Sequence, residues 1–421
     1  MFEWSETDEM IRESVRAFID KEVRPHLDEL EHGDLPPYDI MRKLFADFGI
    51  DVMAGEAVDA MLAKEQAKAD RIAAGEPAPE RSDKKKGGGN PLAAQGSMAA
   101  VLVSELTGVS LGSVAAVGVS LGLGAATIAS RGTLAQKRRW LKDIVTLEKV
   151  AAWAITEPDS GSDAFGGMKT YVRRDGEDYL LNGQKTFITN GPFADTIVVY
   201  AKLDEGDDGD KRERKVLTFV LDKGMEGLTQ GKPFKKMGMH SSPTGELFFD
   251  NVRLAKDRLL GETEDHKGGD GRESARSSFS VERIGCAILS LGIINECRRL
   301  SIEYAKSRKL WGQEIGRFQL IQLKLAEMEV ARINVENMVF NALESMAAGK
   351  IPTLAQASAM KLYSTKAATD VAMEAVQLFG GNGYMAEYRV EQLARDAKSL
   401  MIYAGSNEIQ VTHVAKGLLA D

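Results

Sequence analysis

The chain has 421 residues with a formal net charge of −8, from 54 Lys and Arg against 62 Asp and Glu, and 43% of its residues are hydrophobic. This length allows two or three domains with ample cores, and the acidic balance argues against a nucleic-acid partner. Cys286 and Cys297 lie in one predicted helix at a spacing that cannot form a disulfide, which fits a reducing compartment. The five scattered histidines form no Cys/His cluster, so we expect no catalytic metal.

The N-terminal third is predicted to be helical, with Ser5 as the first N-cap and Pro36-Pro37 as a break. Residues 54–74 have a good helix composition with a thin apolar face. Residues 101–129 are apolar but are interrupted by Glu105 and several glycines, so we expect a buried pair of helices with close backbone contacts and no membrane span. Because the acidic N-terminus carries no secretory signal, we expect a cytoplasmic protein, with an organellar matrix still open.

Residues 77–91 interrupt this helical region with prolines, three consecutive lysines and three consecutive glycines. Such a composition cannot bury enough apolar surface to order itself, so a flexible, solvated linker is expected. Anion binding by the lysines is the alternative interpretation.

Strand patterns dominate from about residue 150 to about residue 260. Asn182-Gly183 stands between two short β-like runs, residues 179–181 and 184–188, and this dipeptide is typical of the type I′ turn of a hairpin. Further strands are expected at residues 196–200, 216–221 and 246–249. Several antiparallel strands without intervening helices predict a small β-barrel or sandwich.

Long helical patterns then follow, at residues 279–306, 318–346, 353–378 and 406–419, which predict an up-down four-helix bundle. The fold class is therefore α+β and multidomain. We expect an N-terminal helical domain (1–149, with a partly flexible insertion at 53–96), a middle β domain (150–262) and a C-terminal helical bundle (263–421).

Glu282 and Arg283 stand side by side near the expected start of the first bundle helix. Burial of the helix face that carries Glu282 would raise the pKa of its carboxyl group and strengthen it as a base for carbon acids. The alternative is an Arg-paired, structural glutamate at the helix rim. Helical steps from Glu282 reach a small and apolar stripe, formed by Gly285, Cys286, Leu289 and Ile293.

Three further motifs are each, taken alone, only weak evidence for a functional site. Residues 153–163 lead from a strand into a Gly/Ser turn with free hydroxyls and N–H groups, suited to a polar cofactor edge. Residues 377–384 end a helix with three glycines, and residues 403–409 contain Ser406, which can cap a helix whose N-terminus suits a pyrophosphate. No Gly-x-Gly-x-x-Gly follows a strand, so a Rossmann site is not expected.

In this order, and with Arg308-Lys309, Trp311-Gly312 and Gln319 between them, the motifs resemble those of the acyl-CoA dehydrogenase family along nearly the whole chain. The resemblance implies a flavoprotein of fatty-acid β-oxidation that forms the trans-2-enoyl-CoA from an acyl-CoA. It also implies FAD across a dimer interface, commonly in a dimer of dimers, and an electron-transfer flavoprotein as acceptor. The implied FAD-binding residues are Trp153, Ile155, Thr156, Ser162, Phe187, Thr189, Arg308, Trp311, Gln319, Gln377, Gly380, Gly381, Ser406 and Glu408, of which the set from Arg308 to Gly381 would reach the FAD of a neighbouring subunit.

One departure from the family pattern concerns the base. Most members carry the catalytic glutamate directly after the tyrosine of the last motif, but here Ala404 follows Tyr403. A smaller branch, including the isovaleryl-CoA and long-chain enzymes, carries it on the bundle helix before an arginine, which is the position of Glu282. The resemblance therefore implies that Glu282 takes the C2 proton while the C3 hydride passes to flavin N5. The backbone N–H of Ala404 would polarise the thioester oxygen.

The remaining implied substrate contacts are Ser162, Arg283, Tyr403, Ala404 and Gly405. Arg283 would steady either the ionised Glu282 or the CoA, and both roles stay open. The resemblance places Val114, Ala115, Gly118 and Val119 on the helix that borders the fatty-acyl pocket, and their small size favours medium or longer acyl groups. The alternatives are an acyl-CoA oxidase or another flavoenzyme on this scaffold, and a scaffold protein that has lost catalysis.

Overall fold

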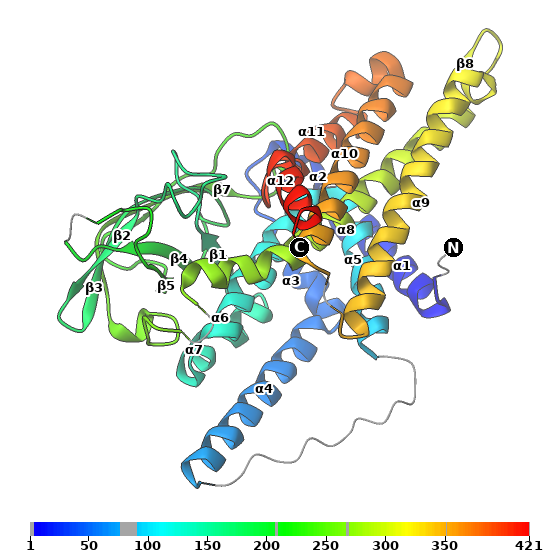
Figure 1. Cartoon of the computed structure of the whole chain (residues 1–421). Coiled ribbons are helices and arrows are strands. Elements are labelled where there is room, and N and C mark those ends of the chain that lie inside the picture. Colours follow the sequence, from blue (N-terminus) through cyan, green and yellow to red (C-terminus); the bar gives the residue numbers. More distant parts are fainter. Residues whose placement is uncertain (1–3, 76–90, 207–208, 267–268, 351, 421) are drawn as a thin grey trace.

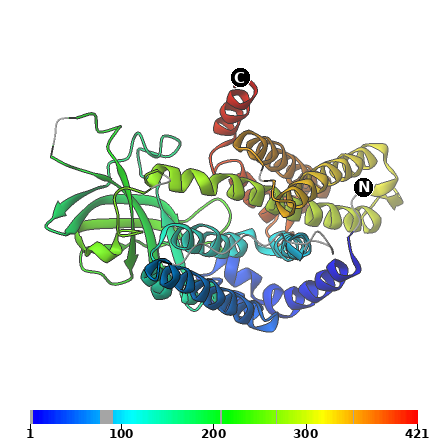
Figure 2. The ribbon, with the colours of Figure 1, turned by 60° about the horizontal axis from the view of Figure 1, so that its bottom comes forward.

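The computed structural model describes residues 4–75, 91–206, 209–266, 269–350 and 352–420. Figure 1 shows a β-sheet at one end of an elongated molecule and a bundle of helices at the other. The N-terminal helices lie along one side of both (Figure 2). This helical, β, helical order confirms the predicted fold class.

The N-terminal region is helical, as predicted. It consists of α1 (Glu6–Phe18), η1 (Ile19–Val23), η2 (Arg24–His26), α2 (Leu27–His32), α3 (Tyr38–Asp47), α4 (Ile50–Ala73), α5 (Pro91–Gly118), η3 (Val119–Ala125), α6 (Ala126–Arg131) and α7 (Leu134–Val145). α4 contains the expected helix of the 53–96 insertion, whereas nearly all of the predicted linker at 77–91 lies outside the described residues.

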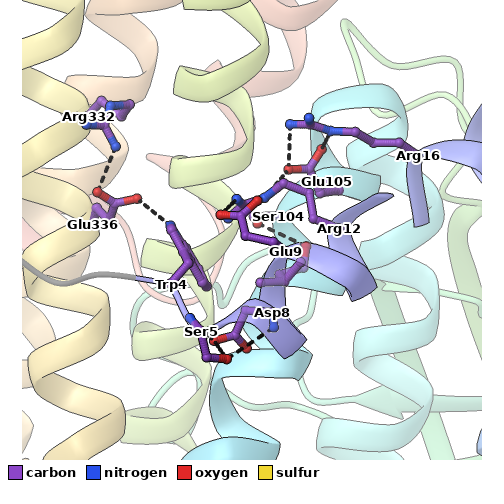
Figure 3. A network of polar contacts seen from close by, with 11 residues as sticks. Trp4, Ser5, Asp8, Glu9, Arg12, Arg16, Ser104, Glu105, Arg332 and Glu336 are labelled. Carbon is purple, nitrogen blue, oxygen red and sulfur yellow. Dashed lines mark hydrogen bonds and ion pairs between the residues drawn. The ribbon is translucent and has the colours of Figure 1, made fainter. Parts of the chain in front are cut away.

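Polar contacts fasten α1 to the rest of the protein (Figure 3). Ser5 and Asp8 form a capping box that satisfies free N–H groups at the helix start. The Trp4 indole N–H donates to Glu336 of α9 (Gln319–Ala347) at 3.2 Å, and the Arg12 guanidinium lies 4.5 Å above the Trp4 ring. The first helix is therefore joined to the C-terminal bundle.

Residues 101–129 form two helical segments that meet at a kink, because Ser110 leaves the helical region with φ −148° and ψ 87°. Two of the glycines allow close packing: a Cβ on Gly112 would lie 2.3 Å from the Ser241 hydroxyl oxygen, and one on Gly124 would lie 2.7 Å from the Ala151 Cβ. Among the described residues, one helical stretch, Gly96–Arg131, is long and apolar enough to cross a membrane, and 56% of its most apolar window is buried in the protein.

The middle region is a seven-stranded sheet in the order β1-β4-β2-β3-β7-β6, with β5 paired to β4. Its strands are β1 (Ala151–Ala154), β2 (Tyr171–Asp175), β3 (Asp178–Thr189), β4 (Thr196–Leu203), β5 (Val216–Asp222), β6 (Leu228–Gln230) and β7 (Thr244–Leu254), and η4 (Lys256–Arg258) follows them. The sheet is mostly but not wholly antiparallel, because β1 and β2 each run parallel to β4. β4 is buried on both faces: Ile197 and Val199 face the core within the sheet, whereas Val198 and Tyr200 face α7.

The predicted hairpin at Asn182-Gly183 is wrong. Both residues lie inside the continuous strand β3, and the turn that precedes it comes earlier, between Asp175 and Asp178. Gly183 adopts φ 138° at a register shift against β7, and a Cβ there would lie 2.6 Å from the Thr170 hydroxyl oxygen. The glycine therefore serves a β-bulge and a close approach of two backbones.

The C-terminal helical bundle is confirmed, with differences at its edges. It consists of α8 (Gly271–Ser307), α9 (Gln319–Ala347), α10 (Leu354–Phe379), α11 (Val390–Leu400) and α12 (Asn407–Leu418), with β8 (Lys309–Leu310), β9 (Gln313–Glu314), η5 (Ile315–Arg317) and η6 (Gly380–Tyr384) between them. α11 was not predicted, and α8 begins eight residues before the expected start at Phe279. The Asp270 side chain accepts from the Arg272 N–H and caps this earlier turn, which has no clear apolar periodicity in the sequence.

Two buried side chains join the three regions. Asn190, held at φ 65°, donates to the carbonyl oxygens of Ala116 at 2.8 Å and Ala151 at 2.9 Å. The Asp396 carboxylate of α11 accepts from the Met239 N–H at 2.5 Å. These contacts hold the sheet in one position against both helical regions.

Candidate active site

Glu282 lies in the fourth turn of α8 and is half-buried. Its pKa is raised to about 7, because burial disfavours the carboxylate, while the positive charges of Arg283 and Lys361 oppose this shift. A carboxylate with such a pKa is partly ionised near neutrality and is suited to general-base chemistry. The early start of α8 places Glu282 within the helix, not at its rim.

Arg283 is buried and turned toward α10. Its guanidinium donates to the Ser358 hydroxyl at 3.0 Å and lies 5.6 Å from the Phe279 ring. Within the described ranges, Arg283 and Glu282 form no ion pair. The Arg-paired interpretation of Glu282 therefore lacks its salt bridge, although the nearby positive charge still lowers the pKa of the carboxyl group.

The turn between α11 and α12 lies against this part of α8. Ala404 and Gly405 both adopt left-handed backbone conformations, with φ 57° and 80°. A Cβ on Gly405 would lie 3.6 Å from an Arg283 guanidinium nitrogen. Burial raises the pKa of the Tyr403 hydroxyl, and the nearby Glu282 adds to the shift. The fold thus brings Glu282 and Arg283 together with Tyr403, Ala404 and Gly405, a group that lies far along the chain from the first.

A second group of predicted site residues surrounds the end of β1. Trp153 is half-buried and donates its indole N–H to the Tyr200 hydroxyl at 3.2 Å, and the Thr156 carbonyl accepts from the Thr186 N–H at 2.9 Å. Phe187 on β3 has φ 57° and leaves 67% of its surface exposed, an unusual position for an aromatic side chain. Its exposed apolar face lies on the strand that also carries Thr189 and that bonds to Thr156 through Thr186, and it suits a flat aromatic ligand.

A buried ion pair supports this second group. The Lys185 ammonium donates to the Glu157 carboxylate at 2.8 Å and to the Ile155 carbonyl at 3.0 Å. The same carboxylate accepts the backbone N–H groups of Lys169 and Thr170. Burial lowers the pKa of Lys185 to about 8. The charged forms of the two buried side chains therefore depend on these hydrogen bonds. Ser162 follows on an exposed loop.

The remaining predicted residues fall into two places. Arg308, Trp311 and Gln319 lie where α8 passes into α9, and Gln377, Gly380 and Gly381 lie at the end of α10. Tyr304 connects these two places: its ring stacks on Phe379 at 4.0 Å, and its hydroxyl accepts from the Asn382 amide at 3.0 Å. In a single chain this region is far from the sheet (Figure 1). Ser406 and Glu408 begin α12, beside the Ala404 turn.

The sequence analysis gave no role to Lys361 or Gln410, two residues that shape the site. Lys361 is fully buried on α10, among Ala357, Thr365 and Ala368. A single lysine on an otherwise small, buried helix stripe was a readable signal for such a residue.

Comparison with known proteins covers nearly the whole chain. Models of the acyl-CoA dehydrogenase N-terminal, middle and C-terminal domains match residues 5–57 with 83–148, 152–252 and 269–419. A caffeyl-CoA reductase-Etf complex subunit from Acetobacterium woodii is 32% identical, with 99% of each chain covered. The mitochondrial isovaleryl-CoA dehydrogenase of Oryza sativa is 31% identical, with 99% of this chain and 92% of the rice protein covered. The butyryl-CoA dehydrogenase structure from Megasphaera elsdenii superposes with a TM-score of 0.82 at 30% identity and covers both chains completely.

Proposed function

This chain belongs to the acyl-CoA dehydrogenase family, and we propose that it oxidises an acyl-CoA to the trans-2-enoyl-CoA with Glu282 as the base. The observation that carries the assignment of the base is the half-buried Glu282 carboxyl group with a pKa of about 7, beside a turn in which Ala404 offers no carboxylate.

The reaction requires the protein to remove a proton from C2 and to stabilise the negative charge that develops on the thioester oxygen. Glu282 would take the C2 proton. The backbone N–H of Ala404 would donate to the thioester oxygen, and this donor does not depend on the side chain at position 404. Arg283 would keep part of Glu282 ionised through its positive charge, since its own hydrogen bond goes to Ser358.

Members of this family use a flavin, and we propose that this flavin is FAD. When bound, FAD supplies the two-electron oxidant that accepts the hydride from C3. Trp153, Thr156, Phe187 and Thr189 would hold its ring, which fits the exposed, apolar face of Phe187. Ser406 and Glu408 would lie along its diphosphate and adenosine part, and the Arg308 to Gly381 set would reach the FAD of a neighbouring subunit.

Glu282→Gln tests this proposal, because glutamine keeps the size of the side chain but cannot accept a proton. We expect turnover to fall by ~10² or more, with FAD content and acyl-CoA binding near wild type, since the lost interaction belongs to the transition state. Adding Ala404→Glu to this variant should restore part of the activity. Turnover above about a tenth of wild type in the single variant would make Glu282 structural and Glu408 the next candidate.

The electron acceptor and the acyl chain are further parts of the proposal. We propose an electron-transfer flavoprotein as acceptor, which the Etf complex named for the Acetobacterium relative supports. Peroxide formed in each turnover would indicate an oxidase instead. We also propose medium or longer acyl groups, since a Cβ on Gly118 would meet no atom within 4 Å. Rates with acyl-CoAs of increasing length and branching measure this preference.

A further inference from the structure

The Ala404–Gly405 turn is held from one side by two donors on different helices. The Lys361 ammonium of α10 donates to the Gly405 carbonyl at 2.6 Å. The Gln410 side-chain amide of α12 donates to the same carbonyl at 2.7 Å and to the Ala404 carbonyl at 3.2 Å. Both carbonyl groups therefore face the helices.

The N–H groups of a peptide point opposite to its carbonyl, so these bonds turn the Gly405 and Ser406 N–H groups away from α10 and α12. The left-handed φ of Ala404 then sets the direction of its own N–H relative to this turn. In the part of the chain that the structure describes, the Ala404 N–H donates to no other group. It remains available to a ligand.

The Lys361 side chain that donates to the turn is fully buried. Burial lowers the pKa of its ammonium, whereas nearby Cys286, Glu282 and Glu408 favour the charged form. On α10 itself, Thr365 contacts the Asn407 amide oxygen, which also accepts weakly from Lys361 at 3.4 Å. The ammonium is thus fixed against the turn and the first residue of α12.

The titratable and charged groups around Glu282 come from four elements. α8 contributes Arg283 and Cys286, and α10 contributes Lys361. The turn contributes Tyr403, and α12 contributes Glu408 and His413, which lie near Lys361 and Arg283, respectively. Lys361 is therefore one of two cations that favour ionised Glu282.

We propose that Lys361 and Gln410 are positioning residues for the dehydrogenation: together they aim the Ala404 N–H at the thioester oxygen. This inference rests on the proposed function. It assigns the same role to two residues that donate to the turn from different helices, so each can be tested by its own variant.

The test compares Lys361→Met and Gln410→Leu with Lys366→Met, a matched change of an exposed lysine on α10 that pairs with Asp370. Isotope-edited infrared spectroscopy of a bound enoyl-CoA labelled with ¹³C at the thioester carbonyl reports how strongly that carbonyl is polarised. We expect the bound carbonyl stretch to move toward its value in water in both turn variants. Turnover should fall about 10- to 100-fold, within the effect of losing an oxyanion donor. The control should match wild type.

An unchanged carbonyl stretch in either turn variant would overturn the aiming role of that residue.

Failure of the proposed function is distinguishable, because it appears in Glu282→Gln, whose turnover would stay near wild type. If Lys361→Met does not fold, Gln410→Leu still tests the aiming role.

Discussion

At the scale of single residues, the pKa of Glu282 results from two opposing effects. Burial alone favours the neutral acid, whereas Arg283 and Lys361 favour the carboxylate. Without burial the group would be a weak base, and without the cations it would be protonated at neutral pH. The position therefore combines a strong base with partial ionisation.

This balance predicts a pH dependence. Only ionised Glu282 accepts a proton, so kcat/KM should fall about tenfold per pH unit below the pKa of the free enzyme. With the pKa at about 7, this fall should begin near neutrality. The residual activity of Glu282→Gln should lack this limb. A wild-type limb close to ~4.3, the value of an ordinary glutamate, would contradict the prediction.

At the scale of elements, the glycines of η3 differ in what they pack against. Gly124 is buried against β1, and a Cβ there would lie 2.7 Å from the Ala151 Cβ. Gly122 is exposed two residues earlier, with no atom within 4 Å of such a Cβ. Close packing of η3 on β1 helps to position the strand that leads to Trp153 and Thr156.

Gly124→Ala should therefore destabilise the protein by ~1–3 kcal/mol, because the added methyl group forces η3 and β1 apart. Gly122→Ala is the matched control and should stay within about 0.5 kcal/mol of wild type. Thermal unfolding of the FAD-loaded proteins measures both. Equal midpoints for the two variants would show that η3 yields to the extra atom without cost.

At the scale of the whole molecule, the predicted FAD-binding residues form separate groups. Phe187 lies on β3 of the sheet, whereas Arg308 and Trp311 flank β8, which lies at the far end of the bundle (Figure 1). Trp311 is 88% exposed in the single chain. We therefore propose that a site that uses both groups is completed by a second subunit.

Arg308→Ala should weaken FAD binding about 10- to 100-fold and reduce the dimer fraction, since an arginine to a phosphate is a charge-assisted contact. Arg317→Ala is the control, because Arg317 lies in the same connection but pairs with Glu314 at the surface. Flavin absorbance per chain and sedimentation measure the two effects. Full FAD retention by an Arg308→Ala monomer would rule out the shared site.

The sequence by itself determined the order of the regions, most helix and strand positions and the family, because capping residues, periodicity and colinear motifs are local properties. It also indicated Glu282, since the apolar stripe that follows lies on one helix. The start of α8 was missed, as its first turns depend on a cap at Asp270 and contain little apolar periodicity.

Only the tertiary structure decided what Asn182-Gly183 does, because its turn-like dipeptide is drawn into β3 by pairing with β7 and by the close approach of Thr170. Only the tertiary structure likewise decided what Lys361 and Gln410 contact. Their contacts with the Ala404 turn join residues of α10, α12 and the loop before it, and a buried cation acquires its role from the groups that the fold places around it. Long-range packing, which local sequence patterns do not encode, thus sets the pKa of Glu282 and the direction of the Ala404 N–H.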